Sequence, residues 1–109
     1  MKFKIDGVQI EEAHRLAAVK VAGTLGIKDA DKLPTEALME IIKSSNSPLK
    51  KPFFEYIEAY DNWAYYYMQY NNKELSEAVS FTMQKLIAKR NDSRNKLENE
   101  NRALKQHKK

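Results

Sequence analysis

The chain has 109 residues, the usual size of a single domain, and 42% of them are hydrophobic, a proportion typical of globular proteins. It contains no cysteine, which excludes disulfides, thiolate metal sites and cysteine nucleophiles. The N-terminal sequence lacks the features of a secretory signal, and no apolar run is long enough to span a membrane. We therefore expect a cytoplasmic protein without membrane association.

The first predicted element is a short β-hairpin over residues 2–10, where side chains alternate around Asp6-Gly7. An Asp-Gly pair between two β-prone runs is typical of a type I′ turn, which needs positive φ at both central positions. Two strands alone are marginally stable in water, so the hairpin is expected to pack on a helix. Its apolar side chains are Phe3, Ile5, Val8 and Ile10.

Apolar residues at helical spacing then predict about four helices. The first is expected over Glu11–Leu25, and Gly26 follows where a left-handed C-cap would stand. The apolar face of this helix consists of Ala13, Leu16, Ala17, Val21 and Leu25. A second helix is expected after Pro34, and the Ser- and Pro-containing segment 44–48 ends it.

These two helices are joined by Leu25-Gly26-Ile27, a polar link and Leu33. The order of helix, extended loop and helix resembles SAP-type and Rho N-terminal modules, a family often associated with nucleic acid. The resemblance implies nucleic-acid binding by this quarter of the chain. Two packed helices with a capped loop explain the same pattern without a ligand.

The third predicted helix holds nine of the eleven aromatic residues, between Phe53 and Tyr70. Its broad aromatic face is predicted to form the core of the domain. Tyr65 and Tyr66 fall outside that face. Because exposed aromatic residues are favoured at interface hot spots, both are predicted to contact a protein partner. The alternative is that another helix of the monomer covers them.

The fourth helix is predicted to start near Lys73 and to continue past Arg90. Asn71-Asn72 is expected to reverse the chain, so that the last two helices are long and form an antiparallel pair. The alternative is one continuous helix, since asparagines weaken a helix without forbidding it. The overall prediction is a mainly α fold, in which a short N-terminal β-hairpin precedes about four helices of a helical bundle.

The C-terminal part of the chain is strongly charged. Residues 89–109 carry eight basic and three acidic side chains, and few of the others are apolar. We therefore divide the chain into a helical domain with its N-terminal hairpin, residues 1–88, and a basic helical extension, residues 89–109, whose end frays. A helix with so little to bury is marginal unless a partner covers it.

No constellation of catalytic residues is evident in the sequence. The two histidines, His14 and His107, lie at opposite ends of the chain, and no glycine-rich phosphate loop occurs among the three glycines. We expect no enzymatic activity, no metal and no cofactor.

The sequence favours a small non-catalytic binding or adaptor protein that is oligomeric or part of a larger assembly. The residues predicted to make its protein contacts are Tyr65, Tyr66, Leu97 and Leu104. The alternative is a nucleic-acid-associated protein that uses the basic C-terminal helix. Its phosphate contacts would be Lys89, Arg90, Arg94, Lys96, Arg102 and Lys105.

Overall fold

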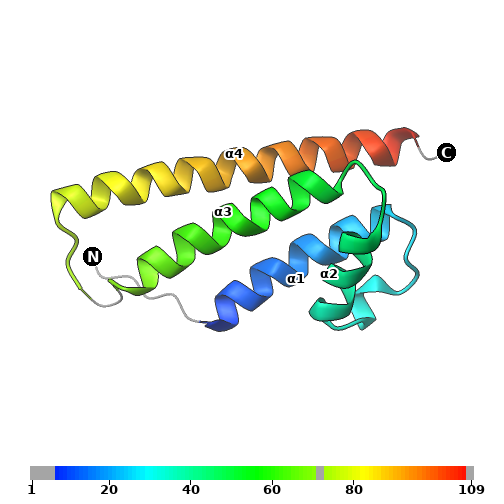
Figure 1. Ribbon diagram of the computed structural model, residues 1–109, viewed down its shortest axis with the longest axis horizontal. Helices are drawn as coiled ribbons and strands as arrows, with labels where there is room; N and C mark the ends of the chain where they lie inside the picture. The colour runs from blue at the N-terminus through cyan, green and yellow to red at the C-terminus, as the bar shows by residue number, and fades with distance from the viewer. Residues whose placement is uncertain (1–6, 71–72, 108–109) are drawn as a thin grey trace.

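The computed structural model describes residues 7–70 and 73–107, and this part of the chain is mainly α-helical (Figure 1). Its α-helices are α1 (Gly7–Thr24), α2 (Thr35–Ser44), α3 (Lys50–Met68) and α4 (Glu77–His107), and a short 3₁₀ helix, η1 (Ala30–Lys32), precedes α2. None of the helices within the described residues is both long and apolar enough to cross a membrane.

The predicted N-terminal hairpin is wrong. Val8 and Ile10, assigned to its second strand, lie in the first turns of α1, while Phe3 and Ile5 are outside the described residues. The turn signal depends on two residues alone. In contrast, a helix places Ile10 on the same side as Val21, which is also buried, so tertiary packing of a longer helix outweighs the local β preference.

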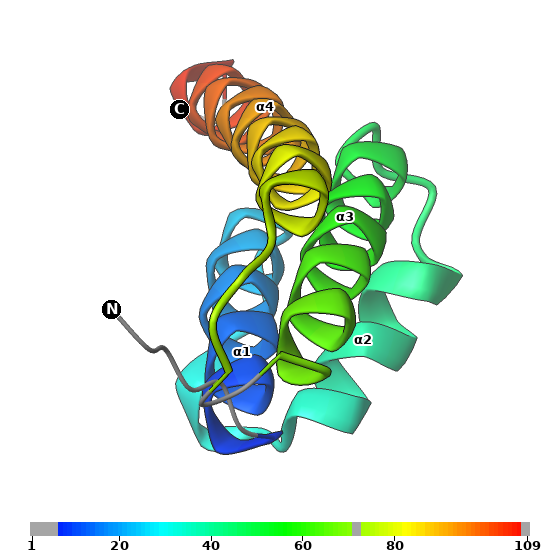
Figure 2. The same ribbon diagram turned by 90° about the vertical axis from the view of Figure 1, so that its left-hand side faces the viewer.

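α1, α3 and α4 form a three-helix bundle in which α3 runs antiparallel to both neighbours (Figure 1). The predicted antiparallel pairing of the last two helices is confirmed, and the alternative of one continuous helix is wrong. α2 packs mainly on α1 (Figure 2). The molecule measures 50 × 24 × 21 Å. Its long axis follows α4, whose 31 residues span about 46 Å at 1.5 Å per residue.

The first core cluster joins all four helices around Phe53, which is fully buried. Its other buried members are Ala18, Val21, Ala22, Ala30, Leu38, Ile42, Leu49 and Leu97. The second cluster lies nearer the start of α1 and contains Ile10, Ala64, Tyr67 and Met83. The aromatic rings of α3 connect the two clusters. Tyr60 and Trp63 have centroids 5.4 Å apart, and Trp63 and Tyr67 5.7 Å apart. Of the predicted aromatic face, Phe53 and Tyr67 are buried, while Tyr56, Tyr60 and Trp63 are half-buried and pack against the two clusters.

The C-terminus of α1 has the predicted left-handed cap. Gly26 has φ 91°, the Ile27 N–H donates to the Ala22 carbonyl at 3.0 Å, and the Gly26 N–H donates to the Gly23 carbonyl at 3.1 Å. This is the hydrogen-bond pattern of a Schellman motif. Two side chains of α1 then fix its position. Arg15 donates to the Leu33 carbonyl at 2.8 Å, and a hydrogen bond of 2.6 Å joins His14 Nε2 to Asp61 Oδ1 of α3.

α4 passes through residue 88 without a break. Its distal half contacts the rest of the fold, because Leu97 is only 5% exposed within the first core cluster and Leu104 packs against that cluster. Leu97 is therefore part of the core and Leu104 is half-buried against it, although both fall in the stretch predicted as an extension.

Candidate functional site

An open groove lies between α1 and α4. α4 packs mainly on α3 and touches α1 much less, and Figure 2 shows α1 and α4 facing each other beside α3. The groove contains a cavity of about 200 Å³, to which Tyr56 of α3 and Leu97 of α4 contribute. The remaining lining residues are Ala13, Leu16, Ala17, Lys20 and Val21 from α1 and Arg94, Glu98 and Asn101 from α4.

The α1 side of the groove is apolar. Ala13, Leu16 and Ala17 are spaced as neighbours on one helix face, and Leu16 is 62% exposed. Of the predicted apolar face of the first helix, Val21 is 1% exposed in the core, Ala13 and Ala17 are half-buried, and Leu16 is open to the groove. The deeply buried residues Ala18 and Ala22 lie farther around α1. The apolar side of α1 therefore extends beyond the part that the described chain covers, and Leu16 is its exposed edge.

The rim of the groove is positively charged. Lys20 and Arg94 line the cavity from opposite helices, and an adjoining hollow is bordered by Lys20, Glu98, Asn101, Arg102 and Lys105. Within residues 7–70 and 73–107, no carboxylate oxygen lies within 4.0 Å of the charged nitrogens of these four basic side chains. Glu98 contributes the negative charge in this stretch, so the rim has an excess of uncompensated positive charge.

Asn101 adds a polar acceptor to the groove. Its side-chain oxygen, Oδ1, is buried and has no hydrogen-bond partner among the described residues. Buried polar atoms are nearly always hydrogen-bonded in folded proteins, because an unpaired one costs about 1–3 kcal/mol.

Arg90 belongs to the core side of α4. Its guanidinium lies 4.3 Å from the centroid of the Trp63 ring and donates to Asn91 Oδ1 at 3.2 and 3.0 Å. Burial, followed by the neighbouring charge of Arg94, lowers the pKa of Arg90 below its ordinary value. Arg90 therefore packs on the aromatic face, and Arg94 is the arginine that lines the cavity.

Three buried or half-buried tyrosines of α3 are expected to lower the stability of the fold at alkaline pH. Burial is the largest cause that raises the pKa of Tyr56 above 10.0; Tyr60 adds to the rise, and Arg94 and Arg90 partly oppose it. Burial is likewise the main cause of the raised pKa values of Tyr60 and Tyr67. Because the unfolded chain loses these protons first, their stabilising contribution is complete below pH 10.0 and is lost as the pH rises through the folded-state values.

Urea unfolding measured from about pH 9 upward checks this expectation. The free energy of unfolding should fall above pH 10.0, and the fall should be shallower in Tyr56→Phe, which removes one of the titrating hydroxyls. Identical pH profiles of the two proteins would contradict the assignment of Tyr56 as a contributor.

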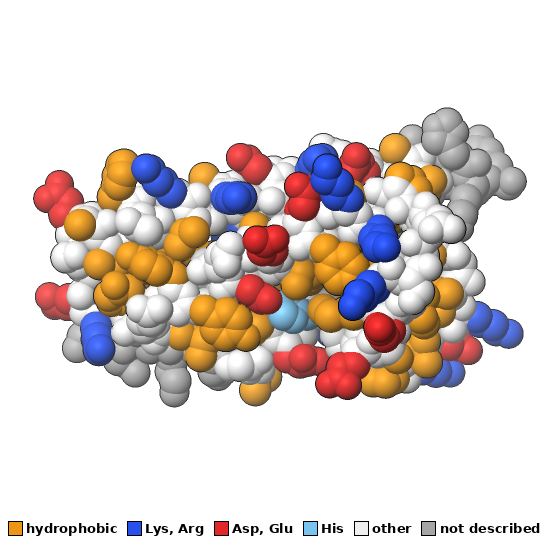
Figure 3. All heavy atoms as spheres, viewed as in Figure 1, with side chains coloured by type: hydrophobic (Ala, Val, Ile, Leu, Met, Phe, Trp, Pro, Cys, Tyr) orange, Lys and Arg blue, Asp and Glu red, His pale blue; other side chains and the backbone are white. Residues whose placement is uncertain are grey.

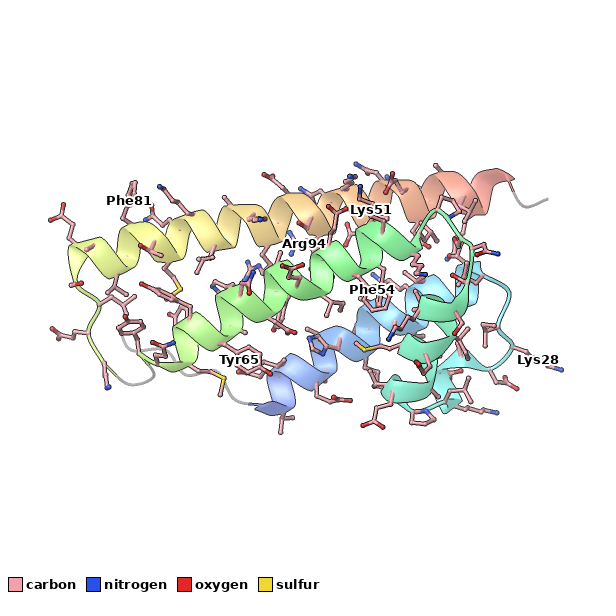
Figure 4. All side chains as sticks on the ribbon, in the orientation of Figure 1. Lys28, Lys51, Phe54, Tyr65, Phe81 and Arg94 are labelled. Atoms are coloured by element: carbon pink, nitrogen blue, oxygen red, sulfur yellow. The ribbon has the colours of Figure 1, made fainter. Side chains whose placement is uncertain are left out.

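The structure separates the four residues predicted for protein contacts. Tyr65 is exposed on α3 (Figure 4), whereas Tyr66 is half-buried with its ring centroid 5.4 Å from that of Tyr70. Leu97 belongs to the core and forms part of the groove, and Leu104 packs against the same core cluster. These residues do not form one surface.

The six basic residues predicted for phosphate contacts are also divided. Lys96 Nζ lies 3.8 Å from Glu55 Oε1, and Lys89 lines a hollow with Glu55 and Glu58 of α3. Figure 3 shows acidic side chains along the middle of this side of the molecule. Arg94, Arg102 and Lys105 border the groove on the α1 side. The basic side chains of α4 therefore lie on two different sides of the helix.

Sequence reasoning missed Leu16, Lys20 and Asn101 as site residues. The signal that could have identified Leu16 is the spread of apolar residues around α1: a face with Leu16 and another with Ala18 and Ala22 exceed what one packing surface needs. Asn101 gives no such signal, because its burial arises only from the arrangement of α4 over α1.

Over the described parts of the chain, no three His, Asp or Glu side chains come together in a way that could hold a metal ion. Comparison with protein-family models, curated proteins and solved structures finds no match to this chain. The resemblance of the first two helices to SAP-type modules therefore stays a prediction.

Proposed function

We propose that this chain is a non-catalytic adaptor that binds a helical segment of a partner protein in the groove between α1 and α4. The observation that carries the proposal is the exposed edge of the apolar side of α1, where Leu16 is 62% exposed beside a cavity. Grooves between helices commonly receive the apolar face of an amphipathic helix.

The dimensions of the groove favour a helix over a small ligand. The cavity of about 200 Å³ is below the roughly 300–1,000 Å³ of pockets that enclose drug-sized molecules. It suits an anchoring side chain of a partner. The part of α1 that lines the groove, residues 13–21, extends about 12 Å along the helix axis, which is enough to contact about two turns of a bound helix.

The nucleic-acid alternative has weaker support. Lys89 and Lys96 face carboxylates of α3, which repel a phosphate backbone and reduce the charge available to it. A phosphate backbone would also leave the apolar face around Leu16 unused. The expectation that the protein is oligomeric stays a prediction, and absolute mass by light scattering on a sizing column tests it.

Two exposed apolar residues allow a matched test of the site. Leu16 is 62% exposed in the groove, and Phe81 is 60% exposed on the opposite side of α4, pointing away from the bundle (Figure 4). Peptides would be selected on the immobilised protein from a displayed library of helical sequences. We expect Leu16→Gln to weaken their binding at least about tenfold, while Phe81→Gln leaves it unchanged, because binding energy concentrates in a few buried apolar contacts.

Glutamine is used in both variants because it removes apolar surface without adding charge. Circular dichroism verifies that each variant keeps the helical content of the parent protein. Selected peptides that bind equally well to Leu16→Gln would place the binding surface outside the groove and contradict the proposal.

A further inference from the structure

We propose that the helix received by the groove is acidic: its apolar side chains enter between α1 and α4, and carboxylates on both flanks meet the basic rim. This inference rests on the proposed function and adds the chemistry of the partner.

Charge complementarity is the main argument. Lys20 lines the cavity from α1 and Arg94 lines it from α4. A positive charge therefore lies on each side of the apolar lining around Leu16. Neither has a carboxylate within ion-pair distance in the described part of the chain. A basic helix placed between them would be repelled from both sides, whereas carboxylates would gain charge-assisted hydrogen bonds.

The positive charge along α4 outweighs the single carboxylate of Glu98. Arg94 and Lys105 are 11 positions apart, or about 16 Å along the helix axis, and Arg102 lies between them. This distance equals about three helical turns. A partner helix lying in the groove could therefore offer several carboxylates in succession.

Other occupants fit the rim less well. The terminal segments outside the described residues contain Lys2, Lys4, Lys108 and Lys109 against one acid, Asp6, so they have the same sign of charge as the rim and are repelled by it. A phosphate backbone matches the charge but offers no apolar groups for Leu16. An acidic amphipathic helix offers apolar side chains to the groove around Leu16 and carboxylates to the basic rim.

Two synthetic helical peptides of the length of α1 test the inference. Both carry the same stripe of leucines and the same fluorescein label, and the flanking positions are glutamates in one and lysines in the other. Fluorescence anisotropy should show that the glutamate peptide binds at least about tenfold more tightly at low salt. The difference should shrink at about 0.5 M NaCl, where charges on the rim are screened.

A pair of charge-reversed variants identifies the rim. In Lys20→Glu/Arg94→Glu the preference should invert in favour of the lysine peptide. The control, Lys89→Glu/Lys96→Glu, changes the net charge by the same amount on the other side of α4, and it should keep the preference for the glutamate peptide.

Each other outcome overturns the inference in a distinguishable way. Equal affinities that are both lost in Leu16→Gln would refute the acidic partner but leave the groove as the binding site. Binding of neither peptide, or binding that is indifferent to Leu16→Gln, would refute both proposals. Displacement of the glutamate peptide by a tighter-binding single-stranded oligonucleotide would assign the rim to nucleic acid.

Discussion

Phe53→Ala is expected to lower the free energy of unfolding by about 3–5 kcal/mol, the largest effect expected of a single truncation in this fold. Phe53 is 0% exposed, and the first core cluster around it joins all four helices. Its ring also contacts Phe54, with centroids 4.9 Å apart. Removing the ring leaves a cavity that those helices cannot all close, and a domain of this size has only about 5–15 kcal/mol in total.

Urea unfolding followed by circular dichroism measures this loss. Phe81→Ala is the matched control, because the same chemical change removes a ring that is 60% exposed. Its cost should stay within about 0.5 kcal/mol. Similar costs for the two variants would mean that the first core cluster does not hold the helices together as described.

Leu97→Ala is expected to cost about 2–4 kcal/mol, the second large effect. Leu97 is only 5% exposed and connects the distal half of α4 to the core residues of the other helices. If residues 89–109 formed a solvated extension separate from the domain, Leu97→Ala would leave the free energy of unfolding almost unchanged. The structure predicts that the domain itself loses stability.

The same unfolding experiment distinguishes these two expectations. Glu100→Ala lies in the same half of α4 but is exposed, so it should change the free energy of unfolding by no more than about 0.5 kcal/mol. If Leu97→Ala were as mild as Glu100→Ala, the distal half of α4 would be independent of the bundle.

The helices and their pairing could be predicted because they depend on local patterns. The aromatic stripe of α3 and the glycine that ends α1 are each visible within a few positions of sequence. The hairpin was predicted from the same kind of local signal and was wrong, since Val8 and Ile10 contribute to a longer helix whose packing is not local.

The groove could not be predicted, because it depends on how helices far apart in sequence meet. The periodicity of α1 placed Leu16 on an apolar face. It could not show that α4 packs mainly on α3 and leaves the Leu16 side chain exposed. Likewise, the sequence grouped Lys96 with Arg94. Only the position of α3 shows that Lys96 faces Glu55 while Arg94 lines the groove.

A fluorescent label at the edge of the groove tests most directly whether a partner binds between α1 and α4. The chain has no cysteine, so Ala13→Cys, which lines the groove and keeps Leu16, and Phe81→Cys each carry one environment-sensitive dye at a known position. On addition of the unlabelled glutamate peptide, the dye at position 13 should shift to shorter wavelength as it leaves water, and the dye at position 81 should not respond. Equal responses at the two positions, or no response at position 13, would contradict the groove between α1 and α4 as the site of partner binding.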